Sequence, residues 1–392
     1  MINLKYIIDV TDKNKAGLFY SVLERISRTR EKNVVFNLSF YDSWLVSRIK
    51  RIFNIKSKER KNTFYYNNVE VQPIHLKRGI FDYLFIAIGL TDIVRMFDAK
   101  KIISKENISN KDIIYAHWGV SSGLIGHYLK KLVSCKLIIC YHGSDIHTIP
   151  VKRKDIRHCL LKALKNADIN VFVSHALFQS AKSLGYEEDN YKVIYNGVED
   201  LYGVNTKNIE VKNFIKKYGL NIKNNSHVIG YIGNLKHVKG ADLLPQITKE
   251  IAWKLPECTF VVAGDGELRK KIQDSCVNTT FIGHIERNDV ALLLGMLDVL
   301  ILPSRNEGLP LIIAEAKKCG VAVVASNVGG VNEILERENC ISFDDDFVNK
   351  FSYRTVKLID NGSINKPLSD SFLWESIITQ ESKMISGIRS GI

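Results

Sequence analysis

Short apolar, β-branched runs recur along this chain, and stretches with helical periodicity separate them. Strands that are apolar on both faces are typical of parallel sheets, because helices cover both faces of such sheets. The pattern therefore predicts an α/β fold built on parallel sheets. The predicted strands are Leu4–Val10, Asn33–Leu38, Asp112–Ala116, Lys136–Tyr141, Ile169–Val173, His227–Ile232, Thr259–Ala263, Thr279–Gly283, Val299–Pro303 and Val321–Ser326.

The length of 392 residues is large for a single hydrophobic core and favours two domains. The stretch Tyr195–Ser226 is rich in Asn and Lys and shows little periodicity, so it is expected to link them. Two doubly wound domains that face each other bind ligands at the carboxyl ends of their strands. We predict an N-terminal domain at 1–200, a linker at 201–226, a second domain at 227–365, and a C-terminal helix at 366–392 that packs back toward the first domain.

The charge balance points to an anionic partner, since 55 basic and 42 acidic residues give a net charge of +13. Nucleic acid is disfavoured because neither a basic stripe with interleaved aromatics nor a helix-turn-helix pattern occurs. The seven cysteines are odd in number, and none forms a two-residue metal or redox spacing, which favours a reducing compartment. The start lacks the features of a signal peptide, and the apolar runs are far shorter than the ~20 residues that span a bilayer. A cytoplasmic protein is expected.

The segment Val299–Leu335 has the most specific pattern: strand, turn, helix, strand and a second helix. Pro310 fits the first helical position and Gly320 the point where that helix stops. Glu307 precedes the helix and Glu315 lies within it, about 7–8 Å beyond Pro310 at ~1.5 Å per residue. Helix amino termini bind phosphate, so these carboxylates could contact hydroxyls on either side of a diphosphate. Two glutamates that merely favour the helix dipole are the simpler alternative.

This segment resembles the donor-binding signature of the family-four retaining glycosyltransferases. The resemblance implies the GT-B fold, in which two Rossmann-like doubly wound domains face each other across a cleft. It extends over nearly the whole chain and is similar to bacterial enzymes that build teichuronic acid and other envelope polysaccharides. Further matching stretches, in family order, are Gly233-Asn234-Leu235 with Lys239-Gly240, Ala263–Glu267, and Phe281–Ile285.

The resemblance implies that Glu307 contacts the transferred sugar and that Glu315 binds the ribose. Lys239 corresponds to the family's diphosphate lysine, whereas Asn234 replaces the usual arginine and Lys236 is a candidate for the missing charge. The implied donor-binding residues are Gly233, Asn234, Lys239, Gly264, His284, Ile285, Glu307, Gly308, Leu309 and Glu315, and the implied catalytic residues are His117, Lys239 and Glu307.

Two stretches of the N-terminal half, Ile113–Gly119 and Cys140–His147, resemble strand-end loops of the same family. The resemblance places His117 close to the donor sugar, and His142 and Asp145 on the acceptor side. A purely structural role remains the alternative for both histidines. The acceptor loop corresponds to Asp12–Gly17, where Gly17 is the single glycine at a place where the family often has two.

The implied reaction is a retaining transfer from a nucleotide-sugar to a saccharide or polyprenyl-linked acceptor, in the synthesis of O-antigen, capsule, lipopolysaccharide or teichuronic-type polymers. No cofactor and no metal are expected, and Asp344-Asp345-Asp346 is interpreted as a solvated acidic loop. Uridine, guanosine and adenosine donors all remain open. A nucleotide-sugar epimerase or a phosphorylase of the same fold is the alternative function.

A basic segment, Arg48–Lys61, contains seven basic residues and one acid. Trp44, Leu45, Ile49, Ile52 and Phe53 fall at helical spacing beside it. A basic helix with a bulky apolar face is typical of proteins that bind an anionic membrane surface. A solvated helix packed on the N-terminal sheet is the alternative.

Overall fold

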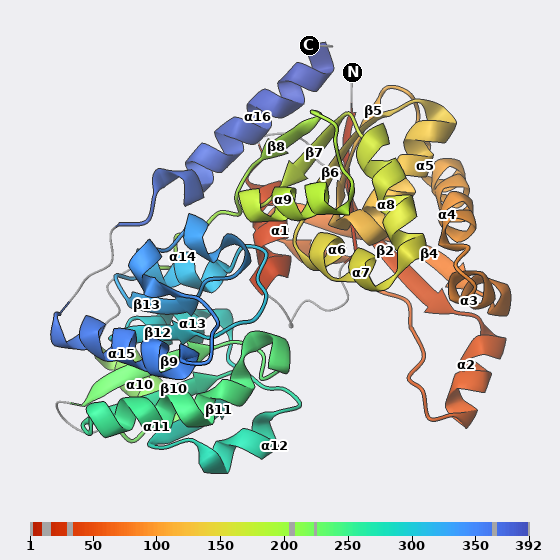
Figure 1. The fold of residues 1–392 in the computed structure, drawn as a ribbon. Coiled ribbons are helices and arrows are strands. Elements are labelled where there is room, and N and C mark those ends of the chain that lie inside the picture. The colour runs from red at the N-terminus through yellow and green to blue at the C-terminus, as the bar shows by residue number, and fades with distance from the viewer. Residues whose placement is uncertain are drawn as a thin grey trace. The chain divides into compact units, whose positions relative to one another are not determined.

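A computed structural model describes residues 3–9, 17–29, 34–203, 208–222, 226–362 and 367–390. The chain divides into two compact units, each built around one sheet (Figure 1). Unit 1 comprises Met1–Asn196 and Glu375–Ile392, and unit 2 comprises Gly197–Trp374. No helix in the described part of the chain is both long enough and apolar enough to cross a bilayer.

Within the described residues, unit 1 holds a sheet in the order β3-β4-β2-β1-β5-β6-β7-β8. Every neighbouring pair is parallel except β3 and β4, which pair antiparallel. The strands are β1 (Asn3–Ile8), β2 (Val34–Asp42), β3 (Phe64–Tyr66), β4 (Val69–Arg78), β5 (Asp112–His117), β6 (Lys136–Tyr141), β7 (Ile169–Phe172) and β8 (Tyr191–Val193). The helices are α1 (Gly17–Ser27), α2 (Trp44–Ile52), α3 (Ile80–Ala87), α4 (Thr91–Glu106), α5 (Leu124–Val133), α6 (Ser144–His147), α7 (Ile149–Lys152), α8 (Lys154–Asn166), α9 (His175–Leu184) and α16 (Trp374–Ser390), the last belonging to unit 1 from Glu375 onward.

Unit 2 has a fully parallel sheet in the order β11-β10-β9-β12-β13-β14. Counted from its first strand, this order is 3-2-1-4-5-6, the order of a nucleotide-binding doubly wound sheet. The predicted fold class is therefore confirmed in this unit. Its strands are β9 (His227–Ile232), β10 (Cys258–Ala263), β11 (Thr279–Gly283), β12 (Val299–Leu302), β13 (Ala322–Ser326) and β14 (Cys340–Ile341), and its helices are α10 (Asn208–Tyr218), α11 (Leu244–Lys254), α12 (Arg269–Ile272), α13 (Arg287–Leu294), α14 (Leu311–Lys318) and α15 (Phe347–Asp360).

The core of unit 2 forms where α11 and α15 cover one face of this sheet. Ile247 and Ile251 of α11 and Phe351 of α15 are fully buried against side chains of the central strands. This packing fixes the strands, so the loops that leave their carboxyl ends have a rigid base.

The stretch expected to be a linker contains helix α10, which the sequence did not predict. Lys217 Nζ and the Tyr218 hydroxyl each donate to Asp289 Oδ2 of α13, at 2.7 and 2.6 Å. Phe214 of the same helix is buried. The Asn- and Lys-rich composition hid a narrow apolar stripe that is enough to pack the helix on unit 2.

Helix α16 packs on unit 1 through a buried polar contact. The Tyr115 hydroxyl donates to Glu381 Oε1 at 2.6 Å, and Arg25 Nε lies 3.2 Å from the same oxygen. The Arg25 and Glu381 side chains are both fully buried. Arg25 also donates to the carbonyls of Ile194 and Tyr195, at the point where the chain leaves unit 1. Arg25 thus contacts both the segment by which the chain leaves unit 1 and the helix α16 by which it returns to this unit.

Candidate functional site

The carboxyl ends of four strands in unit 2 meet through closely packed loops. Gly264, just after β10, has φ +130°, and a Cβ there would overlap the carbonyl oxygen of Gly233 after β9. Gly329, after β13, has φ +53°, and a Cβ there would overlap the carbonyl oxygen of Glu307 after β12. Only glycine combines these dihedral angles with so close an approach. The glycines therefore bring the predicted donor loops into backbone contact.

Lys239 and Glu307, predicted separately from sequence, form an ion pair. Lys239 Nζ lies 2.7 Å from Glu307 Oε1 and 2.8 Å from Oε2. The Glu307 side chain is 7% exposed and the Lys239 side chain 31%. A nearly buried carboxylate is thus neutralised by a cation that solvent or a ligand can still reach.

Arg305 clamps the two loops that carry this pair. Its guanidinium donates two hydrogen bonds to the Asp242 carboxylate, at 2.7 and 2.8 Å, and one to the carbonyl of His237 at 2.7 Å. Paired hydrogen bonds of this kind fix geometry as well as charge. The sequence interpretation missed Arg305, although its place in the turn of the Val299–Leu335 segment was a usable signal.

Glu315 lies on α14 and is enclosed by residues from two other segments. Burial raises the pKa of this carboxyl to about 7, while the nearby Arg287 and a hydrogen bond with Tyr202 oppose the rise. Tyr202, only 3% exposed, comes from the segment that enters unit 2. Neither Tyr202 nor Arg287 was predicted, because the polar stretch around Tyr202 carries no periodicity that would mark a buried side chain.

The remaining predicted donor residues line the same loops with different exposures. Pro310 is the residue before α14, and Gly308 accepts a hydrogen bond from Gly330 N at 3.1 Å. The helix expected after Gly330 is only the short 3₁₀ turn Gly329–Glu333, since β14 follows soon after it. Asn234, Lys236 and His284 are exposed, whereas Ile285 and Leu309 are buried.

In unit 1, His117 ends β5 and His142 directly follows β6, the neighbouring strand. His117 Nδ1 lies 3.0 Å from His142 Nε2, so one ring donates to the other. Burial, His142 and Arg25 together hold the pKa of His117 well below its usual value, and burial followed by Arg25 lowers the pKa of His142 to about 3. Both rings are therefore neutral at physiological pH. Among the described residues, His117 Nε2 and His142 Nδ1 find no hydrogen-bond partner.

Asp145 holds the two histidine loops together. Its carboxylate accepts hydrogen bonds from the backbone N–H groups of Gly119 and Gly143, both at 2.8 Å, and from His142 N at 3.1 Å. Trp118, next to His117, has φ +70° and begins a π-helical turn. Such backbone is costly for a bulky residue and is concentrated at functional sites.

Gly17 begins α1, but the rest of the predicted acceptor loop, Asp12 to Ala16, lies outside the described residues. The structure therefore brings together His117, His142 and Asp145 in unit 1, and Lys239 with Glu307 in unit 2.

One cluster in the described residues has metal-ligand character: His117, Cys140 and His142, all buried. Arg25 Nη1 lies 3.4 Å from Cys140 Sγ, and burial raises the pKa of this thiol to about 12. A protonated thiol beside a fixed guanidinium does not suit a cation. These residues fit a hydrogen-bonded histidine pair better than a metal centre.

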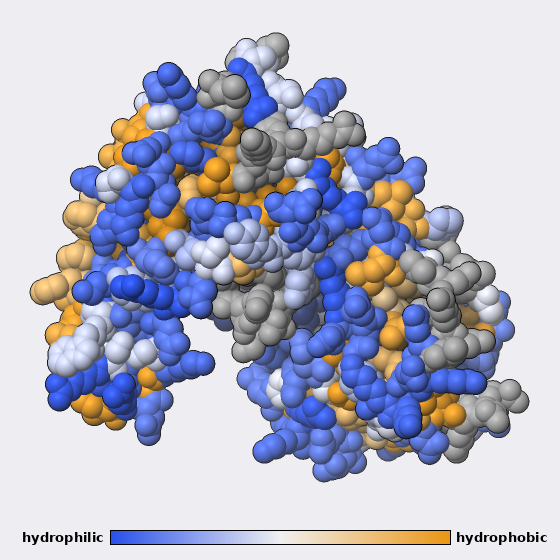
Figure 2. Space-filling view, turned by 180° about the vertical axis from the view of Figure 1, so that it is seen from behind, coloured by the Kyte–Doolittle hydropathy of each residue, from blue (hydrophilic) through white to orange (hydrophobic). Residues whose placement is uncertain are grey.

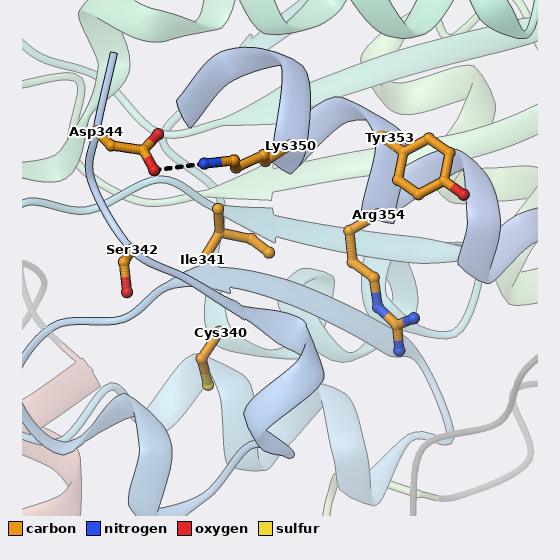
Figure 3. A pocket seen from close by; sticks show the side chains of 7 residues that line it. All are labelled: Cys340, Ile341, Ser342, Asp344, Lys350, Tyr353 and Arg354. Atoms are coloured by element: carbon orange, nitrogen blue, oxygen red, sulfur yellow. Dashed lines mark hydrogen bonds and ion pairs between the residues drawn. The ribbon is translucent and has the colours of Figure 1, made fainter. Parts of the chain in front are cut away.

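Asp344, the first residue of the acidic triplet Asp344–Asp346, lines an open hollow of about 370 Å³ at the end of β14 (Figure 3). Asp344 pairs with Lys350 at 2.5 Å, and Arg354 donates to Asn339 at 2.6 Å. The charges that line this hollow are thus engaged with one another or with neighbouring side chains. None of the predicted donor residues lines it.

Comparison with known families finds two matches that follow each other along the chain. Residues 61–200 match the model of glycosyltransferase family 4, and residues 212–363 match glycosyl transferases group 1. An uncharacterized glycosyltransferase of Methanocaldococcus jannaschii is 28% identical over 85% of this chain and 90% of its own length.

Two further relatives are matched over shorter spans. A protein of Bacillus subtilis named as a putative teichuronic acid biosynthesis glycosyltransferase, TuaC, is 27% identical over 57% of this chain and 55% of its own. The Escherichia coli UDP-Gal:α-D-GlcNAc-diphosphoundecaprenol α-1,3-galactosyltransferase is 26% identical over 64% of this chain and 65% of its own. Among solved structures, Anabaena HepE in complex with UDP superposes with a TM-score of 0.71 at 17% identity, covering 98% of this chain and 100% of HepE.

Proposed function

The chain belongs to the family-four glycosyltransferases and has the GT-B fold, and we propose that it transfers a sugar from a nucleotide-sugar to a saccharide or lipid-linked saccharide of the cell envelope. The observation that carries the proposal is the Lys239–Glu307 pair at the carboxyl ends of a 3-2-1-4-5-6 sheet, with Glu315 on the helix beside it. Open α/β sheets bind their ligands at that edge.

The ion pair suggests how a donor would enter. A diphosphate attracts Lys239, whose side chain is the more exposed partner. As the lysine turns toward the phosphates, the Glu307 carboxylate becomes available to accept hydrogen bonds from sugar hydroxyls. Glu315, enclosed by Tyr202 and Arg287, would accept hydrogen bonds from the ribose. The name of the HepE structure, which includes UDP, supports a nucleotide diphosphate as the ligand class.

We further propose that transfer retains the anomeric configuration and needs no metal. The departing diphosphate gains negative charge as the glycosidic bond breaks, and Lys239 with the loop N–H groups can stabilise it as fixed charges and dipoles. The leaving phosphate accepts the acceptor's proton, so no side-chain nucleophile is required. His117, held neutral, would contact the donor sugar by hydrogen bonding rather than by charge.

The acceptor is proposed to be a polyprenyl-linked saccharide at the inner face of the plasma membrane. The name of the Escherichia coli relative includes a diphosphoundecaprenol-linked sugar, and the Bacillus subtilis relative is named for teichuronic acid synthesis. The basic segment Arg48–Lys61 supports an anionic membrane as a partner, as expected from its charge. O-antigen, capsule and other envelope polymers all fit this acceptor class.

Calorimetric titration with UDP, GDP and ADP tests the donor site. One nucleotide should bind to the wild type, and Glu315→Gln should weaken it at least tenfold. Glu257→Gln is the matched control, because Glu257 is exposed and precedes β10 at the opposite end of the strands. The proposal would be contradicted if the wild type, Glu315→Gln and Glu257→Gln bound the nucleotide with equal affinity, or if the wild type bound none of the three nucleotides. Release of nucleotide that depends on an added acceptor separates a transferase from an epimerase.

A further inference from the structure

Helix α3 of unit 1 is apolar yet lies on the surface. Its sequence, IFDYLFIA, contains a single charged residue, and none of its eight residues, all described, is buried. Phe81, Leu84 and Ile88, which follow at spacings of three and four along α3 and its end, are 73%, 48% and 60% exposed. Residues at this spacing share one face of a helix. The helix thus presents an apolar face that nothing in the described part of the chain covers.

Helix α2 presents a second apolar face, bordered by cations. Trp44, Ile52 and Phe53 are 71%, 74% and 70% exposed, and the Arg48 guanidinium lies 5.2 Å from the Trp44 ring. Beyond the helix, the chain runs through an exposed basic stretch. The exposed cations of this region are Arg48, Arg51, Lys56, Lys58 and Arg60.

A three-residue contact joins the two helices into one surface. Lys50 Nζ of α2 donates to the Tyr83 hydroxyl of α3 at 3.1 Å and to Asp42 Oδ2 at 2.9 Å. The Tyr83 hydroxyl donates to Asp42 Oδ1 at 2.5 Å, and Lys50 also lies over the Tyr83 ring at 4.6 Å. Figure 1 shows α2 and α3 at the same end of unit 1, and orange side chains gather at the corresponding left edge of Figure 2.

We propose that α2 and α3 form one docking platform for an anionic lipid bilayer, with the apolar side chains of α3 inserted and the cations around α2 at the lipid phosphates. The inference deepens the membrane part of the proposed function. Its basis is charge complementarity: the apolar faces are bordered by five exposed cations, a composition that matches the boundary between acyl chains and anionic headgroups. Arg51, Asn54, Ile55, Lys56 and Ser57 line an open hollow of about 390 Å³ on this surface.

Co-sedimentation of the full chain with vesicles tests the platform. Phosphatidylcholine vesicles containing phosphatidylglycerol at roughly a third of the lipid should bind the protein, and vesicles of phosphatidylcholine alone should bind it at least tenfold more weakly. The triple variant Phe81→Ser/Leu84→Ser/Ile88→Ser should lose at least tenfold in binding to the anionic vesicles. Arg48→Gln/Arg51→Gln should bind the anionic vesicles more weakly by about fivefold per removed charge at low salt. The loss should be smaller at high salt, because salt screens these charges. Trp253→Ser, a 77% exposed apolar residue of unit 2, is the matched control and should bind as the wild type does.

Insertion depth is measured independently of any binding loss. The reference protein is Trp44→Phe, which keeps Trp118, Trp253 and Trp374. The emission that Phe81→Trp adds to this reference should be blue-shifted with anionic vesicles and quenched by lipids brominated along the acyl chain. Full binding by the α3 triple variant, equal binding to both vesicle types, or an unshifted emission of the Phe81→Trp protein would overturn the platform. A concentration-dependent dimer that the triple variant abolishes, without vesicle binding, would also overturn it and assign this face to a second copy of the chain. Transfer to a short, water-soluble acceptor should be unchanged in all platform variants, so loss of docking is distinguishable from failure of the proposed activity.

Discussion

Replacing Lys239 with alanine separates what the Lys239–Glu307 pair does for the fold from what it does in the reaction. The change leaves a carboxylate that is 7% exposed without its cation. Breaking a buried pair costs about 3–5 kcal/mol and a surface pair about 0–1 kcal/mol. This pair is intermediate, so we expect a loss of about 2 kcal/mol and a fall in Tm of about 4–8 °C. In turnover, loss of a charge-stabilising donor predicts a decrease of about 10²–10³-fold at saturating donor.

Five variants complete this experiment: Lys239→Ala, Glu307→Gln, the double variant, Lys239→Arg and the control Lys249→Ala. The double variant should regain about 1–2 kcal/mol relative to additive losses, because the unpaired charge is gone, but it should not regain turnover. Lys239→Arg should keep part of the activity, and Lys249→Ala, an exposed lysine on α11, should keep all of it. If Lys239→Ala raised the donor KM and left kcat unchanged, the lysine would stabilise the bound donor and the transition state equally, and the reasoning would be refuted.

Three further outcomes follow from the described contacts. The kcat/KM for the donor should fall as pH drops below about 7, because protonation removes Glu315 as an acceptor; in Tyr202→Phe, which loses a hydrogen bond to the carboxylate form, the fall should begin at a higher pH. A pH profile identical to that of the wild type would argue against this contact. Glu381→Gln leaves Arg25 buried without its counter-charge, so unit 1 should lose about 3–5 kcal/mol and about 10 °C in Tm, and a calorimetric scan with no shift would contradict the pairing. The pKa of His142 is lower in the folded chain than in the unfolded one, so its contribution to stability is complete above about pH 6.5 and is lost as pH falls toward 3. The free energy of unfolding of His142→Asn, measured by urea titration, should therefore fall less steeply over this pH range than that of the wild type, by about 1.4 kcal/mol per pH unit.

The sequence predicted most of the central strands because they are buried on both faces. β9 begins and ends where expected, and β6 does so in unit 1; β11 also has the expected bounds, although it is an edge strand whose residues are mostly only partly buried. In contrast, β4 was missed: it alternates buried and exposed positions and includes Pro73, so it lacks a continuous apolar run. The helix α10 was missed for a related reason, since Asn and Lys dominate its exposed face.

For the candidate site, the sequence predicted the loops that carry the site residues better than it predicted the side chains that contact those residues. Glycine spacing and two glutamates identified the loops after β9, β12 and β13, and the structure places Lys239 on Glu307 there. The partners Tyr202 and Arg287 depend on tertiary contacts that no local pattern encodes, whereas Arg305 lies in the turn of the Val299–Leu335 segment and was overlooked there. The hydrogen bond between His117 and His142 likewise requires the parallel pairing of β5 with β6.

The most direct test of the central claim is acceptor-dependent sugar transfer, measured with a panel of radiolabelled UDP-, GDP- and ADP-sugars and polyprenyl-diphosphate saccharides in excess chelator. The account predicts that one nucleotide-sugar is consumed, that the label moves to the lipid with its anomeric configuration retained, and that Glu307→Gln and Lys239→Ala lose most of the transfer while Glu257→Gln does not. Transfer that stops with chelator and returns with magnesium or manganese, or that is undiminished in both site variants, would contradict it.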